Sequence, residues 1–176
     1  MQSVPLSVPR PHIEVLREAP KPCASRSADE QIAGMEYMYK MLGWSFTTSG
    51  LIVPEKRPGF DRLIVLADTT LTNNRVYDAC DASFPSWRYA ADLDAAIPAD
   101  KDERHPKNGI YAVWFRDCVE ADEELKNLSA NMLREQEPKI KTITVIERQM
   151  LELVYYMETG KHLDIHNWTL CSGSRS

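Results

Sequence analysis

Two short runs of apolar and aromatic residues do most to decide what this chain can fold into. They are residues 63–67, with sequence LIVLA, and residues 110–115, with sequence IYAVWF. Both are too short for a stable helix. Both are rich in β-branched or aromatic side chains without polar alternation, which is typical of strands covered on both faces. The sequence therefore predicts two central strands of a small sheet with helices packed against it.

Two capping boxes predict where helices begin. Ser27 and Glu30 form the first, and Thr144 and Glu147 form the second. Behind each box, apolar residues recur at steps of three and four, which places them on one face of a helix. The glycines that can end these two helices are Gly43 and Gly160.

Two further helices and three further strands complete the expected fold. Thr72 and Pro85 are candidate start and stop signals for a helix between them, and Pro138 closes a helix expected over residues 121–136. Short strands are expected over residues 51–53, 87–89 and 163–170. The strand at 87–89 would complete a strand–helix–strand unit over residues 62–90. The predicted fold class is therefore α/β, or α+β, with a small mixed sheet and about four helices.

The domain boundaries follow from the prolines and from the small polar residues. Five of the eleven prolines lie within residues 1–26, and proline both removes a backbone donor and restricts the residue before it. We therefore expect a disordered, proline-rich arm over residues 1–26. Residues 27–171 are expected to form a single domain, and residues 172–176 a flexible tail.

Cysteine usage and apolar content indicate a cytoplasmic, soluble protein. The cysteines are Cys23, Cys80, Cys118 and Cys171, which are far apart and form no C-x-x-C pair. With 43% hydrophobic residues, the chain can build a core without a disulfide framework, so free thiols are expected. No apolar run approaches the roughly 20 residues of a membrane span, and the N-terminus lacks the pattern of a secretory signal.

The negative charge of the chain is concentrated in one stretch. Residues 92–124 contain ten acidic and four basic residues, against a net charge of −5 for the whole chain. Such a surface repels a phosphate backbone. We therefore expect no nucleic-acid partner. The lack of a long apolar run leads us to expect no membrane partner either, while a protein partner stays open.

The first candidate site lies where the two central strands end. Asp68, Thr69 and Thr70 follow the first strand, and Arg116 and Asp117 follow the second. In open α/β sheets, ligands bind outside the carboxyl ends of parallel strands, so parallel strands would bring these five residues together. The alternative for residues 68–70 is a turn that caps the following helix.

The second candidate is the segment His162-Leu163-Asp164-Ile165-His166. On a strand, His162, Asp164 and His166 would share one face, and imidazole and carboxylate groups are ligands for transition metals. Side chains two residues apart on a strand are separated by about 7 Å, too far for three ligands on one ion. We therefore expect no metal here, although a turn in place of a strand would bring the groups together.

The motifs of phosphate and dinucleotide binding are absent, because no two of the seven glycines lie within three residues of each other. No cofactor is expected. The leading interpretation is a non-catalytic interaction or scaffold domain. The alternative is a small metal- or phosphate-dependent enzyme that uses the residues of one candidate site.

Three segments carry a resemblance to known proteins: residues 108–117 (NGIYAVWFRD), 121–130 (ADEELKNLSA) and 158–175 (ETGKHLDIHNWTLCSGSR). They resemble a group of bacterial proteins without an assigned activity. Members of that group continue into a C-terminal module similar to the variable region of retroelement-diversified proteins, which adopts a C-type-lectin-like fold. The resemblance implies that this chain is the constant part of a binding protein, without the variable module, or a truncated member of the group. It assigns no catalytic residue.

Overall fold

The computed structural model describes residues 21–125, 128–136 and 141–175. It contains helices and a two-stranded antiparallel sheet, an α+β arrangement consistent with the expected class. The α-helices are α1 (Ala28–Met41), α2 (Asn73–Ser83), α3 (Leu93–Ala96), α4 (Ala130–Gln136) and α5 (Val145–Thr159). The strands are β1 (Arg62–Leu66) and β2 (Tyr111–Phe115). Four short 3-10 turns are η1 (Cys23–Ser25), η2 (Ala99–Lys101), η3 (Pro106–Asn108) and η4 (Glu123–Leu125).

The helix start signals read from the sequence are confirmed. Ser27 and Thr144 each accept from the backbone of the glutamate three residues on, and that glutamate bonds back to the capping residue. Thr72 caps α2 in the same way without the reciprocal bond. These bonds satisfy amide groups that have no partner inside the helix, so each helix begins where its cap stands.

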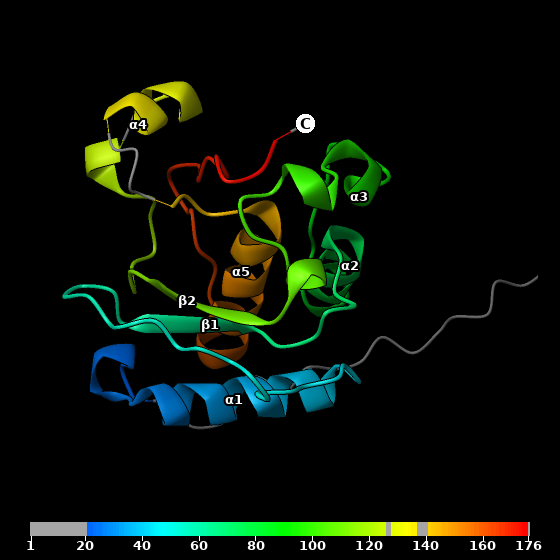
Figure 1. Ribbon diagram of the computed structural model, residues 1–176, viewed down its shortest axis with the longest axis vertical. Helices are drawn as coiled ribbons and strands as arrows, with labels where there is room; N and C mark the ends of the chain where they lie inside the picture. The colour runs from blue at the N-terminus through cyan, green and yellow to red at the C-terminus, as the bar shows by residue number, and fades with distance from the viewer. Residues whose placement is uncertain (1–20, 126–127, 137–140, 176) are drawn as a thin grey trace, which may run out of the picture.

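The two strands pair antiparallel, with Arg62 opposite Phe115 and Leu66 opposite Tyr111. In Figure 1, the strand pair lies between α1 on one side and α5 on the other. Helix α2 packs along α5. All five residues of β1 are buried. The expectation of parallel central strands, which the first candidate site needed, is therefore wrong.

Helix α1 closes the edge of β1 that no strand covers. Gln31, Met35 and Tyr39 follow one another at steps of four along α1. Their side chains accept from the amides of β1 and its continuation: Leu63 N to Gln31 Oε1 at 2.8 Å, Val65 N to Met35 Sδ at 3.0 Å, and Ala67 N to the Tyr39 hydroxyl at 3.1 Å. Four helical residues advance about 6 Å and two strand residues about 6.6 Å, so the two spacings match along this edge.

The expected strands over residues 51–53, 87–89 and 163–170 are not formed. Both edges of β1 are already occupied, one by β2 and the other by α1, so the 87–89 segment has no edge of β1 to pair with. Trp87 and Tyr89 in this segment are 81% and 65% exposed. The single helix expected over 121–136 is not formed: within the described residues this stretch holds only η4 and α4, and residues 121–122 and 128–129 are not helical. Residues 126–127 and the expected stop at Pro138 lie outside the described residues. Trp114 in β2 is only partly buried; its indole N–H donates to Pro54 O at 2.9 Å.

Both expected boundaries of the domain move outward. Cys23 is 1% exposed, and Arg26 forms an ion pair with Glu158 of α5 at 2.8 Å, so residues 21–26 belong to the folded body. At the other end, Gly173 N donates to Ile143 O at 3.0 Å and Glu103 N donates to Gly173 O at 2.8 Å. Residues 172–175 are therefore packed rather than a tail. The remainder of the expected arm, residues 1–20, and Ser176 lie outside the described residues.

Candidate functional site

Antiparallel pairing separates the two halves of the first candidate site. Because Leu66 faces Tyr111, residues 68–70 follow the end of β1 at which β2 begins. Residues 116 and 117 leave the sheet at its opposite end, next to Arg62. The structure therefore does not bring the two halves together, and each has its own surroundings.

Asp68, Thr69 and Thr70 form a turn that leads into α2. One carboxylate oxygen of Asp68 accepts from the Thr70 amide at 2.8 Å and from the Thr70 hydroxyl at 2.6 Å, and Arg75 reaches the other at 3.3 Å. Burial opposes the charged form, but the hydrogen bonds from Thr70 outweigh it and the pKa of Asp68 is lowered. These contacts match the alternative interpretation, a turn that caps the following helix.

Asp117, itself exposed, belongs to an ion cluster centred on the buried Arg62. Its carboxylate lies 2.8 Å from Arg62, which is 5% exposed and also contacts Glu158 at 2.7 Å. Arg26 binds the other oxygen of Glu158 at 2.8 Å. The cluster ties residues 21–26, β1 and α5 together. Arg116 points elsewhere and contacts Asp122 at 3.2 Å.

The second candidate does not form a strand, and the side chains of His162 and Asp164 have different partners. His162 contacts Glu152 at 2.8 Å and stacks on Tyr156. Asp164, at a left-handed φ of 53°, accepts from Arg148 at 2.9 Å. Within the described part of the chain, no group of three or more His, Cys, Asp or Glu side chains could hold a metal ion.

Instead, residues 163–170 form a loop, here called the 163–170 loop, that two carboxylates hold in place. Asp164 accepts from the Thr169 hydroxyl at 2.9 Å and from the Thr169 amide at 3.2 Å. Glu120, from the neighbouring segment, accepts from the amides of His166 at 3.1 Å and Asn167 at 2.9 Å. The Asp164 amide also donates to Val119 O at 2.8 Å. The loop therefore has a defined backbone although it has no regular secondary structure.

The apolar side chains of this loop and its neighbour face solvent. Trp168 is 92% exposed, Leu170 60%, Ile165 56% and Val119 38%. Together these four side chains are here called the apolar surface. The sequence shows these apolar residues, but the predicted strand over 163–170 turned Ile165 toward the core, whereas Ile165 is 56% exposed.

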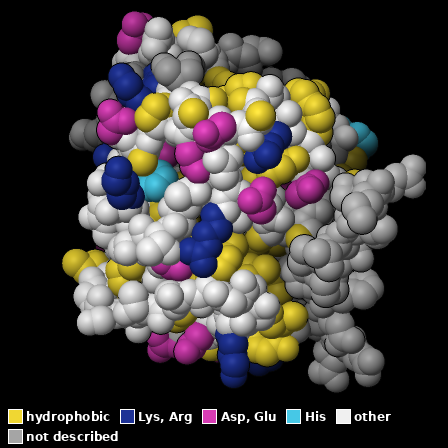
Figure 2. Space-filling view, turned by 90° about the vertical axis from the view of Figure 1, so that its right-hand side faces the viewer, with side chains coloured by type: hydrophobic (Ala, Val, Ile, Leu, Met, Phe, Trp, Pro, Cys, Tyr) yellow, Lys and Arg dark blue, Asp and Glu magenta, His cyan; other side chains and the backbone are white. Residues whose placement is uncertain are grey.

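A cavity of about 520 Å³ lies where the segment before α2 faces α3, η2 and η3. Figure 2 views the face that carries α2 and α3, where a histidine side chain lies recessed between charged and hydrophobic groups. Of the residues predicted as ligand contacts, Thr69 and Thr70 line this cavity and Asp68, Arg116 and Asp117 do not. The other lining residues are Thr72, which the sequence marks as a helix cap, and Leu71, Asp94, Pro98, Ala99, Asp100, His105 and Lys107, which no sequence motif marks.

Within the described residues, no helix is both long and apolar enough to cross a lipid bilayer. All four cysteines are free thiols, as expected, with Cys23 and Cys80 buried and Cys118 exposed. No family model, curated protein or solved structure matches the chain.

Proposed function

We propose that this chain is a non-catalytic interaction domain that binds a protein partner through its apolar surface. The observation that carries the proposal is Trp168, an indole 92% exposed on a loop whose backbone is fixed by hydrogen bonds. Tryptophan is enriched among the residues that dominate binding energy at protein interfaces. A backbone already held in one conformation also lowers the ordering cost of association.

The surroundings of Trp168 favour a protein partner with an apolar pocket. Ile165 and Leu170 come from the same loop, and Val119 is joined to that loop through its carbonyl oxygen. Burying these side chains would remove apolar area from water, which drives association. Of the nearby carboxylates, Glu120 accepts from the loop backbone at Asn167. Asp164 accepts from the Thr169 hydroxyl and from Arg148.

The rival interpretation, a small metal- or phosphate-dependent enzyme, needs the candidate side chains to be available for chemistry. Asp68, Asp117 and Asp164 are instead engaged with Arg75, Arg62 and Arg148, and each pair joins two segments of the fold. The resemblance of residues 158–175 to proteins that continue into a binding module also supports the interaction proposal.

The test compares two exposed tryptophans. Wild-type protein is used to capture and identify its partner, and the Kd of the purified pair is then measured for wild type, Trp168→Ala and Trp87→Ala. We expect Trp168→Ala to weaken binding by about 30-fold or more, the effect of a hot-spot residue, and Trp87→Ala to change Kd less than about twofold. Both variants should keep the wild-type Tm, because both side chains are exposed.

Equal Kd values for wild type and Trp168→Ala would show that the apolar surface is not the binding site. The proposal is also contradicted if wild type and Trp168→Ala capture the same proteins, or if wild type captures none.

A further inference from the structure

The cavity beside α2 contains a buried histidine that its own fold leaves half satisfied. His105 precedes η3 and is 4% exposed. Its Nδ1 accepts from the Lys107 amide at 3.1 Å. Within the described structure Nε2 has no hydrogen-bond partner. It is not sealed from solvent. Because His105 lines the cavity, Nε2 opens into it.

The hydrogen bond at Nδ1 assigns the proton of the neutral ring. A nitrogen that accepts from an amide carries no hydrogen, so in neutral imidazole the proton is on Nε2. Burial is the largest influence on the ring and lowers the pKa of His105, which keeps the ring neutral at pH 7. His105 therefore offers one N–H donor to the cavity, and within the described residues no side chain or backbone group accepts from it.

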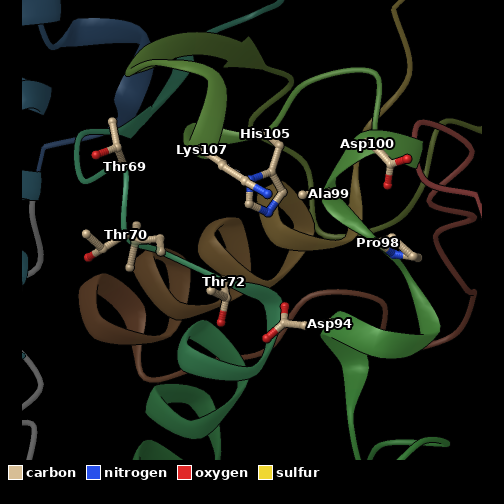
Figure 3. Close-up of a pocket in the computed structure, with 10 residues that line it drawn as sticks. Thr69, Thr70, Thr72, Asp94, Pro98, Ala99, Asp100, His105 and Lys107 are labelled. Carbon is tan, nitrogen blue, oxygen red and sulfur yellow. Dashed lines mark hydrogen bonds between the residues drawn. The ribbon is translucent and has the colours of Figure 1, made fainter.

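Of the charged side chains that line the cavity, one is hydrogen-bonded within the described part of the protein and two are not. Asp94 accepts from the Asn73 amide at 2.8 Å and the Asn74 amide at 3.4 Å, so the start of α2 offsets its charge. Lys107 and Asp100 are both exposed, and no ion pair or side-chain hydrogen bond is recorded for either within the described structure. In Figure 3, His105 and Lys107 project from the wall opposite Thr69, Thr70 and Thr72, with Asp94 at the edge of α2.

The remaining wall is apolar and suits the body of a small molecule. Leu71, Pro98 and Ala99 contribute it. A volume of about 520 Å³ lies within the range of roughly 300–1,000 Å³ typical of ligand sites.

We propose that this cavity binds a small molecule through an anionic oxygen group, a carboxylate or a phosphate, which accepts from His105 Nε2–H and pairs with the Lys107 ammonium. The body of the ligand rests on Leu71, Pro98 and Ala99, and its hydrogen-bond donors face the Asp100 side. This site is separate from the apolar surface, because no residue of the 163–170 loop lines the cavity. It stands or falls independently of the interaction proposal.

The test is an NMR titration of protein labelled with ¹⁵N in histidine and lysine side chains. Sodium acetate and inorganic phosphate are the probes, and sodium chloride at matched ionic strength is the control. We expect a saturable shift of the His105 Nε2 resonance with at least one probe and none with chloride. The stronger probe identifies the anionic group as carboxylate or phosphate.

Two variants separate binding from fold. Lys107→Met removes an exposed charge and should weaken the probe by about tenfold, as expected for loss of a hydrogen bond to a charged group, with an unchanged spectrum elsewhere. His105→Gln keeps an amide that can donate and should retain measurable binding, whereas His105→Phe should abolish it. No saturable shift at His105, or equal affinity in wild type and Lys107→Met, would overturn the proposal.

Discussion

Tyr39 shows how much one side chain can contribute to this fold. Its hydroxyl donates to Val65 O at 2.9 Å and accepts from Ala67 N at 3.1 Å, and the residue is fully buried. The helical spacing of apolar residues placed Tyr39 in the core, which is confirmed. The spacing alone carried no information about the two backbone groups that its hydroxyl satisfies, because those belong to a strand 26 and 28 residues away.

Replacing Tyr39 with phenylalanine should lower the free energy of unfolding by about 1–3 kcal/mol, because the Ala67 amide and the Val65 carbonyl lose their buried partner. The matched control is Tyr37→Phe in the same helix, where the side chain is 53% exposed and a change below about 0.5 kcal/mol is expected. Urea unfolding followed by circular dichroism measures both. Equal stability of the two variants would mean that water replaces the Tyr39 hydroxyl at the edge of β1.

At the scale of elements, the sheet is narrower than the sequence indicated. The apolar run at residues 63–67 predicted a buried strand inside a wider sheet. Further strands of that sheet were expected over 51–53, 87–89 and 163–170. The burial was predicted correctly, but its cause was not. Gln31, Met35 and Tyr39 supply acceptors along the free edge of β1, so a helix takes the place of a third strand. A hydrophobicity pattern records burial and cannot distinguish these two ways of satisfying an edge.

Gly173 tests the packing of residues 172–175 against the rest of the domain, and Gly34 in α1 is the comparison. A Cβ on Gly173 would lie 2.5 Å from Thr142 O and 2.9 Å from Ile143 O, both backbone atoms. Gly173→Ala should therefore lower the Tm by several degrees, because the 172–175 segment must shift away from residues 142 and 143. Gly34 in α1 has open space around it, and Gly34→Ala should raise stability by about 0.5–1 kcal/mol.

Differential scanning calorimetry of the two glycine variants gives the comparison. The opposite signs are the informative result, since both changes add the same methyl group. A wild-type Tm for Gly173→Ala would mean that residues 172–175 do not hold the position described here.

At the scale of the whole molecule, Asp102 makes stability depend on pH. Both of its carboxylate oxygens are sealed from solvent, and the nearby Ser174 hydroxyl does not reach good hydrogen-bond geometry with either. Burial, with Glu147 adding to it and Ser174 opposing it, raises the pKa of Asp102 from 3.8 to about 6. The unfolded chain then ionises at lower pH than the folded one. Stability is lost as pH rises between these two values and the full penalty applies above them.

Asp102→Asn should therefore stabilise the protein at pH 7.5 by about 1–2 kcal/mol, a value discounted because the residue is partly exposed. The gain should shrink as the pH falls towards ~4, where Asp102 is protonated in both states. Chemical unfolding at several pH values measures it. Asp100→Asn, two residues away on an exposed position, is the control and should show no such trend. A gain for Asp102→Asn that is constant with pH would contradict the assignment.

Taken over the molecule, local signals were readable from the sequence and long-range ones were not. Capping at Ser27, Thr72 and Thr144 depends on residues three positions apart, and all three were found. The first candidate site depended on strand direction, which is set by pairing between residues 62–66 and 111–115 and leaves no local trace. His105 and Lys107 were missed for the same reason, because only the fold places them opposite Thr69 and Thr70.

The backbone bond from Glu103 to Gly173 has a consequence for the order in which the protein is made. A ribosome adds about 5–20 residues per second, so the 70 positions between these residues take roughly 4–14 s to synthesise. Ile143 waits for the same glycine. Until residue 173 is made, the backbone amide of Glu103 and the carbonyl of Ile143 lack the partner that Gly173 supplies. The final closure of this region is thus a late event in biosynthesis, and a nascent chain stalled before residue 173 leaves this part of the body open.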